Sequence, residues 1–341
     1  MSSRAVWLVG CLVFAATFAA ISGRAWAAVE YKILTGAESG TYYAIGRDLA
    51  KLVAPSADIK LQVVSTGGSV ANASLLASEP GAKLAIIQAG VMQALVNDAN
   101  SPNAKAHKSL RVVLPLFATE LHYLVRADSE MNYLHDIKNA KINLGDVGGG
   151  AGPATEAIYR MMFGGAIPKN NVGEDSNEAA LIKLVIDKTT DVVVVASGQP
   201  APLIANMKPG ANKFVKLLKF DVNHPLSKQV TGAYMPATIN AASYPNLLAD
   251  DLTTIAVGAY LVTFDYTAKD TANTLARFAR QLCQSLPTLQ ALGHPKWQSV
   301  SLNLPALGAG LSYYAPTEKE LRACTAPQPQ EAAEMPVAKT K

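Results

Sequence analysis

The chain has 341 residues, half of them hydrophobic, and its 30 basic and 26 acidic residues give a formal net charge of +4. This length accommodates one large domain or two of ordinary size. The charges are nearly balanced, and Lys and Arg do not gather in a dense run with aromatic residues, so the composition argues against a nucleic-acid-binding protein.

The N-terminus has the features of an export signal. Arg4 precedes an almost uninterrupted apolar run over residues 5–21, and Ala25-Trp26-Ala27 has the small-x-small pattern of a cleavage site. We therefore predict a signal peptide over residues 1–27, cleaved near Ala27, and a periplasmic mature protein. The apolar run also approaches the length of about 20 residues that a spanning helix needs. An uncleaved anchor that holds the protein on the outer face of the inner membrane is therefore the alternative.

Strand-like and helix-like segments alternate through the first part of the exported chain. Strands are expected at 31–34, 59–64 and 84–88, and helices at 44–53, 69–78 and 91–96. Ser69 is a suitable N-cap for the second of these helices, because it follows the turn formed by Thr66, Gly67 and Gly68.

The alternation continues to about residue 292. Strands are expected at 111–117, 122–126, 141–144, 191–196, 213–220 and 253–264, and helices at 153–163, 177–186 and 267–292. Four consecutive valines at 192–195 are typical of a buried central strand in a parallel sheet. Short strands separated by helices favour a parallel α/β architecture. Residues 326–341 are rich in Pro, Gln, Ala, Glu and Lys without an apolar period, so they are predicted to be a disordered tail.

Two glycine-containing turns lead from a strand into a helix, at residues 35–43 and 145–155. Such a turn leaves backbone N–H groups unpaired, and the helix dipole adds partial positive charge, so the turn can hold a small anion. A helix cap without a ligand would explain one such turn alone. Two of them about 110 residues apart suggest two lobes that face one ligand.

Motifs of catalysis are missing from the sequence. It has no Gly-x-Ser-x-Gly elbow, and the glycines at 148–152 fit neither a dinucleotide fingerprint nor a phosphate loop. The five histidines are scattered without a pair at i, i+4. No metal, cofactor or catalytic residue is predicted, and we expect a binding protein rather than an enzyme.

Three cysteines occur, and Cys11 would leave with the signal peptide. Cys283 and Cys324 remain in a chain that is read as exported, so a disulfide between them is permitted. Two free thiols, one buried and one exposed, are the alternative.

Four segments resemble the TAXI solute receptors of TRAP transporters, which are extracytoplasmic binding proteins. They are Thr35-Gly36 with Ser39 to Gly46, then Ser65 to Asn72 with Leu75 to Ser78 and Leu84 to Gln88, the loop Gly150-Ala151-Gly152-Pro153-Ala154-Thr155, and Val194 to Pro202. They appear in family order across roughly residues 30 to 325. The resemblance implies a type II periplasmic binding protein fold, with two α/β lobes, a hinge and an interlobe cleft.

The resemblance also implies a division into lobes. Residues 28–120 and 232–325 are expected to form the first lobe and residues 121–231 the second. The chain should cross the hinge near residues 117–124 and again near 219–234.

The implied function is capture of a small organic anion, such as glutamate, glutamine or a dicarboxylate, for delivery to TRAP membrane permease subunits. The residues expected to contact the ligand are Ser39, Gly40, Thr41, Tyr42, Tyr43, Ser69, Gln88, Gly149, Gly150, Ala151, Gly152, Thr155, Gly198 and Gln199. Glu38 stands where the family commonly has a small or hydroxylated residue, which places a carboxylate beside this site. Arg126 could clamp a carboxylate or form a structural ion pair.

Two other functions remain open on the sequence alone. The first is a sensory protein that binds a ligand and signals to a membrane partner. The second is an exported enzyme on the same fold, which would need a paired acid and base in the cleft. A neighbouring gene for a large permease would favour transport, and one for a histidine kinase would favour sensing.

Overall fold

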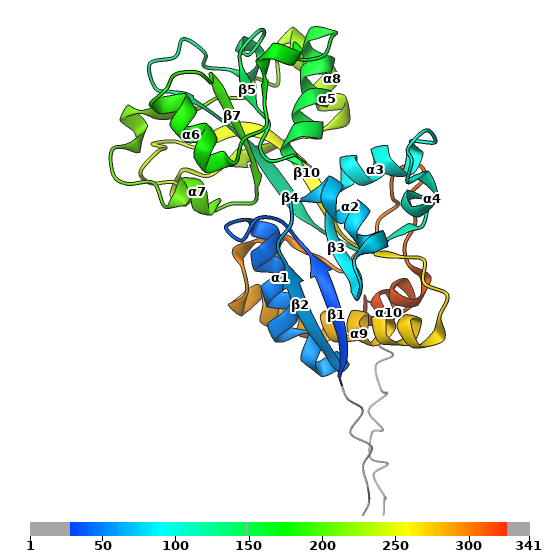
Figure 1. Cartoon of the computed structure of the whole chain (residues 1–341). Helices are drawn as coiled ribbons and strands as arrows, with labels where there is room; N and C mark the ends of the chain where they lie inside the picture. The colour runs from blue at the N-terminus through cyan, green and yellow to red at the C-terminus, as the bar shows by residue number, and fades with distance from the viewer. Residues whose placement is uncertain (1–27, 148, 326–341) are drawn as a thin grey trace, which may run out of the picture.

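The computed structural model describes residues 28–147 and 149–325. The expected signal peptide at 1–27 and the expected tail at 326–341 lie outside the described residues. Two α/β lobes are joined by long strands that run through both of them (Figure 1). The expected fold class, α/β with two lobes, is confirmed.

One sheet extends through both lobes in the order β2-β1-β3-β10-β4-β7-β5-β6, with β8 paired to β4 and β9 paired to β10. The strands are β1 (Val29–Leu34), β2 (Ile59–Val64), β3 (Ala82–Gln88), β4 (Leu110–Arg126), β5 (Ile142–Asn143), β6 (Val172–Gly173), β7 (Val192–Ser197), β8 (Val215–Leu217), β9 (Met235–Ile239) and β10 (Leu252–Phe264). The outer strands of each lobe pair in parallel, as the alternating pattern predicts. The expectation of a parallel sheet is wrong for the centre, because β10 and β4 pair antiparallel with each other and with their neighbours.

Six of the helices in the described residues agree closely with the predicted segments, and four, at residues 104–107, 202–205, 228–233 and 315–325, were not predicted. The helices are α1 (Thr41–Leu52), α2 (Ser69–Ser78), α3 (Ala89–Asn97), α4 (Ala104–His107), α5 (Ala151–Phe163), α6 (Asn177–Val185), α7 (Pro202–Ala205), α8 (Lys228–Ala233), α9 (Lys269–Leu292) and α10 (Ala315–Thr325). Leu275, Phe278, Leu282 and Leu289 form the buried face of α9, as their helical spacing predicts.

Strand β4 is the first crossing between the lobes. The sequence suggested two strands here, but residues 110–126 form one strand of 17 residues. Phe117 packs in the core of the first lobe and Leu121 in the core of the second. We therefore place the first crossing at residues 118–120.

The second crossing lies in β10. Val257 belongs to the core of the second lobe and Ala259 to the core of the first. Gly258 pairs with Ala118, so the two crossings lie side by side in the sheet. The sequence placed this crossing near residues 219–234. That position is wrong, because Phe220 is buried in the core of the second lobe.

The segment between these positions also packs in the second lobe. Ile239, Tyr244 and Leu252 share a core cluster with Val193 and Val195 of β7. We therefore assign residues up to about 257 to the second lobe, rather than ending it at residue 231.

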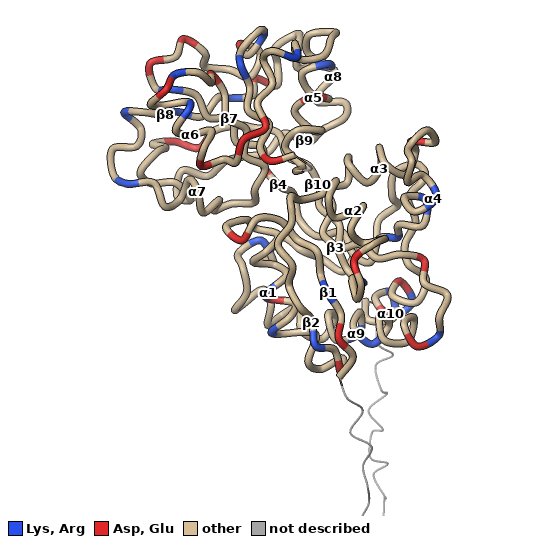
Figure 2. Tube along the Cα trace, in the orientation of Figure 1, with Lys and Arg blue, Asp and Glu red and all other residues tan. Residues whose placement is uncertain are grey.

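Charged residues of both signs are interspersed over the two lobes, without a continuous basic band along the trace (Figure 2). Among the described residues, no helix has the length and apolar character needed to cross a membrane.

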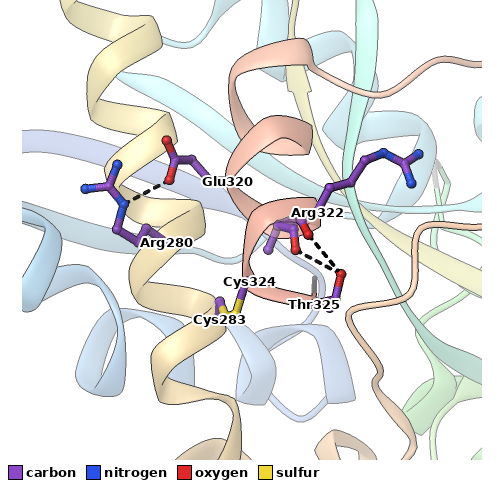
Figure 3. Close-up of a disulfide and its surroundings, with 7 residues drawn as sticks. Arg280, Cys283, Glu320, Arg322, Cys324 and Thr325 are labelled. Carbon is purple, nitrogen blue, oxygen red and sulfur yellow. Dashed lines mark hydrogen bonds and ion pairs between the residues drawn. A yellow bond between two sulfur atoms is a disulfide. The ribbon is translucent and has the colours of Figure 1, made fainter. Parts of the chain in front are cut away.

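The two C-terminal helices pack against each other and are joined by a disulfide between Cys283 of α9 and Cys324 of α10, as Figure 3 shows. Their Cα atoms are 6.5 Å apart, which is within the range that a disulfide can bridge. An ion pair between Arg280 and Glu320 connects the same helices, with a distance of 2.9 Å from Nε to Oε2.

Candidate ligand-binding site

A cavity of about 130 Å³ lies between the two lobes. Its lining comes from the segment before α1, the start of α2, the end of β3, the loop before α5, the start of α6 and the end of β7 with the loop that follows. The lining residues are Gly36, Ala37, Ser39, Gly40, Thr41, Tyr42, Thr66, Gly67, Gly68, Ser69, Gln88, Leu144, Gly145, Asp146, Gly149, Gly150, Ala151, Asn177, Glu178, Val194, Val195, Ala196, Ser197, Ala201, Pro202 and Leu203.

Four helices of at least nine residues begin at this cavity. Those that begin after Gly40, Gly68 and Gly150 have no side-chain cap on their first-turn N–H groups. The fourth, α6, is capped by Ser176, whose hydroxyl accepts a hydrogen bond from the Ala179 N–H. Three uncapped helix N-termini at one cavity provide N–H donors and partial positive charge for an anionic group.

Three polar side chains from the first lobe face the cavity together. The hydroxyl of Ser69 accepts a hydrogen bond from the Gln88 backbone N–H at 3.0 Å. The phenolic oxygen of Tyr42 is buried near the side chains of Thr119, Ser69 and Gln88, but none of them meets the geometry of a hydrogen bond to it. Burial raises the pKa of Tyr42 to about 12, although Thr119, Ser69 and Gln88 oppose this rise. The phenol therefore stays protonated and can donate a hydrogen bond to a ligand.

The charged side chains of the described lining are both acidic. Asp146 and Glu178 are exposed at the rim of the cavity, and no Lys, Arg or His belongs to the lining among the described residues. Carboxylates at the rim favour a cationic group on the ligand. The described lining offers a dianion N–H groups and hydroxyls, but no positively charged side chain.

The glycine-rich loops of the two lobes touch each other. A Cβ at Gly67 would lie 2.9 Å from the Val147 carbonyl oxygen, and a Cβ at Gly68 would lie 3.2 Å from the Gly149 Cα. Gly68 also has a φ of 104°, which disfavours other residues. These glycines therefore allow the loops of the two lobes to approach each other.

A second contact between the lobes involves Thr41 at the start of α1. Its hydroxyl lies 3.1 Å from the Ser197 hydroxyl and 3.2 Å from the Gly198 carbonyl oxygen. The aliphatic chain of Lys296 packs on Gly198, and its ammonium lies 2.6 Å from Glu120 Oε1 in β4. The lobes are thus held together on both sides of the cavity.

A buried chain of hydrogen bonds supports the end of β7, where Ser197 contacts Thr41. His122 Nδ1 lies 3.2 Å from the Val195 carbonyl oxygen, and its Nε2 lies 2.8 Å from the Tyr244 hydroxyl. That hydroxyl accepts a hydrogen bond from the Ala201 N–H. Burial lowers the pKa of His122 to about 4, so the imidazole is neutral and Nδ1–H donates to Val195 while Nε2 accepts from Tyr244.

The structure brings nine of the predicted contact residues to the cavity. They are Ser39, Gly40, Thr41, Tyr42, Ser69, Gln88, Gly149, Gly150 and Ala151.

Five predicted residues lie outside the lining. Thr155 is fully buried in the second lobe beside the Tyr123 phenol, and Gly152 packs near Leu144. The Gln199 amide is occupied by the backbone of Thr238 and Asn240. Tyr43 is half-buried and Gly198 meets Thr41 and Lys296 rather than the cavity. The geometry does not support direct ligand contact for these five.

Two charged residues, whose contact with the ligand the sequence did not decide, also lie away from the cavity. Arg126 pairs with Asp128 at 3.4 Å and Asp191 at 3.9 Å, which corresponds to the structural ion-pair alternative. Glu38 is exposed and does not line the cavity.

Sequence reasoning missed most of the second lobe's contribution. Asp146, Asn177 and Glu178 have no motif of their own, and the signal that could have found them is the helix start at Ser176 and the loop after β5. Thr66 lies within a segment that carries the family resemblance. Its hydroxyl donates to the Asn72 side chain at 2.6 Å, which fixes the turn into α2.

Among solved structures that are similar to this chain, BugD supports the architecture. BugD, a periplasmic binding protein, superposes with a TM-score of 0.50 at 13% identity, covering 87% of this chain and 93% of that one. ArtJ, the arginine-, lysine-, histidine-binding protein of Geobacillus stearothermophilus, gives 0.46 at 10% identity, covering 81% and 96%. The substrate binding protein of an amino acid ABC transporter gives 0.44 at 13% identity, covering 79% and 96%. Residues 33–303 match the NMT1-like family, and the chain therefore belongs to this family.

Proposed function

We propose that this protein is an extracytoplasmic receptor that binds a small solute between its two lobes and delivers it to a membrane permease. The observation that carries the proposal is the interlobe cavity, where three uncapped helix N-termini meet the buried phenol of Tyr42. Backbone N–H groups from two lobes can enclose one ligand and hold the lobes closed around it.

We further propose that the ligand is an α-amino acid. Its carboxylate would accept hydrogen bonds from N–H groups at the starts of α1, α2 and α5 and from Tyr42. Its ammonium would face the rim carboxylates of Asp146 and Glu178. The acidic rim makes a simple dicarboxylate the weaker candidate, since both of its charges would have to rest on N–H groups and hydroxyls.

The assignment to a TRAP permease of the TAXI type belongs to the same proposal. It is supported by the four sequence segments in family order, all of which contribute residues to the cavity lining. The signal peptide that the sequence predicts at residues 1–27 supports an extracytoplasmic location.

A thermal-shift screen of the purified exported protein tests the ligand class. The panel contains the common L-amino acids, succinate, malate and 2-oxoglutarate. A ligand at 100 times its Kd stabilises the protein by about 2.7 kcal/mol, which raises Tm by several degrees in a protein of this size. We expect an L-amino acid to produce this shift and succinate to produce none. A shift with the acids that lack an amino group, and none with amino acids, would contradict the proposed ligand class.

Matched variants then test the site. Asp146→Asn and Glu178→Gln remove the rim charges without a large change in size, and both should weaken amino-acid binding. Glu38→Gln is the control, because Glu38 is exposed and outside the lining. Equal weakening by all three variants would indicate a general charge effect rather than ammonium recognition.

A further inference from the structure

A second cavity of about 200 Å³ lies on the far side of Gln88 from the polar cavity. Except for Gln88 and the Tyr234 phenol, its lining side chains are apolar or absent. They are Val70, Gly90, Val91, Ala94, Leu95, Pro153, Ala154, Ala157, Tyr234 and Val257. Most of the lining of this apolar cavity comes from α3 of the first lobe and α5 of the second. Among the described residues, Gln88 alone lines both cavities.

Gln88 spans the space between the lobes. It is the last residue of β3, its side chain is buried, and its backbone N–H is fixed by the hydroxyl of Ser69. A Cβ on Gly150 of the opposite lobe would lie 2.5 Å from Gln88 Nε2 and 2.9 Å from Oε1. The amide therefore rests against Gly150, and only a residue without a side chain leaves room for it there.

We propose that Gln88 separates the polar cavity from the apolar one and thereby sets the length of the ligand's side chain. This inference rests on the proposed function, because it needs an α-amino acid in the polar cavity. A ligand held at the helix N-termini reaches Gln88 with its side chain. A short or polar side chain ends at the amide, and a longer apolar chain would have to pass it to reach the apolar cavity.

Removing the amide should open this path. Gln88→Ala and Gln88→Ser both shorten the side chain while they keep the backbone bond to Ser69. Each methylene that enters apolar surroundings strengthens binding by about fourfold. Norleucine, with three more methylenes than alanine, should therefore gain at least about tenfold in affinity relative to alanine in the variants.

The experiment measures the affinities of L-alanine, L-norvaline, L-norleucine and L-2-aminooctanoate by isothermal titration calorimetry. The wild-type protein should bind the short members best and lose affinity with chain length. In Gln88→Ala and Gln88→Ser the order of affinities should reverse, so that the long members bind best. Circular dichroism and Tm establish that each variant is folded. If Gln88→Ala does not fold, Gln88→Ser provides the same test.

Two further variants test the path itself. Leu95→Ala widens the apolar cavity but leaves Gln88 in place, so it should keep the wild-type order. Ala157→Leu added to Gln88→Ala fills the apolar cavity and should remove the gain for the long members.

The outcomes separate this inference from the proposed function. If the wild-type protein binds alanine and the order of the series is the same in the Gln88 variants, Gln88 does not set ligand length, although the receptor role stands. The inference also fails if Leu95→Ala reverses the order as Gln88→Ala does. If no protein of the set binds any of the four amino acids, the inference fails, and the thermal-shift screen of the common L-amino acids decides whether the proposed ligand class stands.

Discussion

The hydroxyl of Thr41 lies 3.1 Å from the hydroxyl of Ser197, although the two residues belong to opposite lobes and are 156 positions apart. Thr41 is the first residue of α1 and Ser197 is the last residue of β7. Both line the cavity between the lobes. The contact therefore exists only when the lobes are closed, and it connects lobe closure to the place where the ligand is expected.

Thr41→Val keeps the size of the side chain and removes this contact. Because the lost hydrogen bond belongs to the closed state, we expect weaker ligand binding. A net hydrogen bond of about 0.5–1.5 kcal/mol corresponds to a loss of roughly 2- to 10-fold in affinity. Isothermal titration with the amino acid found by the thermal-shift screen measures it. Thr263→Val is the control, since its hydroxyl bonds to the Lys83 carbonyl oxygen within the first lobe. It should lower Tm without changing affinity, and an equal loss of affinity in both variants would contradict the role of Thr41.

The ion pair between Lys296 and Glu120 should behave as a coupled unit. Both side chains are largely buried, and Glu120 Oε2 has no partner among the described residues. Lys296→Met leaves a buried carboxylate unpaired, which is expected to destabilise the fold by about 3–5 kcal/mol. Adding Glu120→Gln should recover most of that loss. Urea unfolding of the four proteins of this cycle measures the coupling energy, and simple additivity of the two single changes would show that the pair is not coupled.

Local sequence patterns predicted most of the fold. The bounds of α2, α6 and α9 lie within two residues of the predicted segments. The prediction of Ser69 as the N-cap of α2 is wrong, because Gly68 takes that position and the Ser69 hydroxyl accepts a hydrogen bond from the Gln88 N–H instead. The continuity of β4 was missed because residues 118–121 combine polar and small residues, which normally end a strand. These residues connect the two lobes, where antiparallel pairing with β10 continues the strand and Thr119, Glu120 and Leu121 are buried. Local sequence patterns do not reveal long-range strand pairing of this kind.

The sequence predicted the site residues of the first lobe better than those of the second. The segment at residues 39–43 and Ser69 combine glycine or hydroxyl residues with a helix start, which is a local pattern. Thr155 and Gln199 have the same chemistry, but tertiary packing turns their side chains into the core or onto backbone groups. Asp146 and Glu178 reach the cavity only because the second lobe folds over the first.

His122 should make stability depend on pH in the mildly acidic range. Its pKa in the folded protein, about 4, is lower than the ordinary value of 6.5, chiefly because of burial. The unfolded chain therefore binds a proton that the folded protein rejects, and the free energy of unfolding falls as pH drops from 6.5 towards 4. The full effect is about 3 kcal/mol, at about 1.36 kcal/mol for each unit of pKa difference.

The matched variant for this pH dependence is His122→Gln, which keeps an amide donor and acceptor but does not titrate. Urea unfolding between pH 4 and pH 8 should show a smaller decrease in the variant than in the wild-type protein. Above pH 7 the two stability curves should run parallel. Identical slopes below pH 6.5 would mean that other groups cause the acid sensitivity.

Loss of the disulfide should destabilise the C-terminal helices. Cys283 and Cys324 are 41 positions apart. Closing a loop of that length is worth about 4 kcal/mol in the chain-entropy model, so Cys283→Ala with Cys324→Ala should lower the free energy of unfolding by about that amount. Urea unfolding measures it, and reducing agent should destabilise the wild-type protein but not the double variant. Arg280→Ala removes the exposed ion pair between the same helices and should have a much smaller effect. Two alkylatable thiols in the unreduced, exported protein would show that the bond does not form.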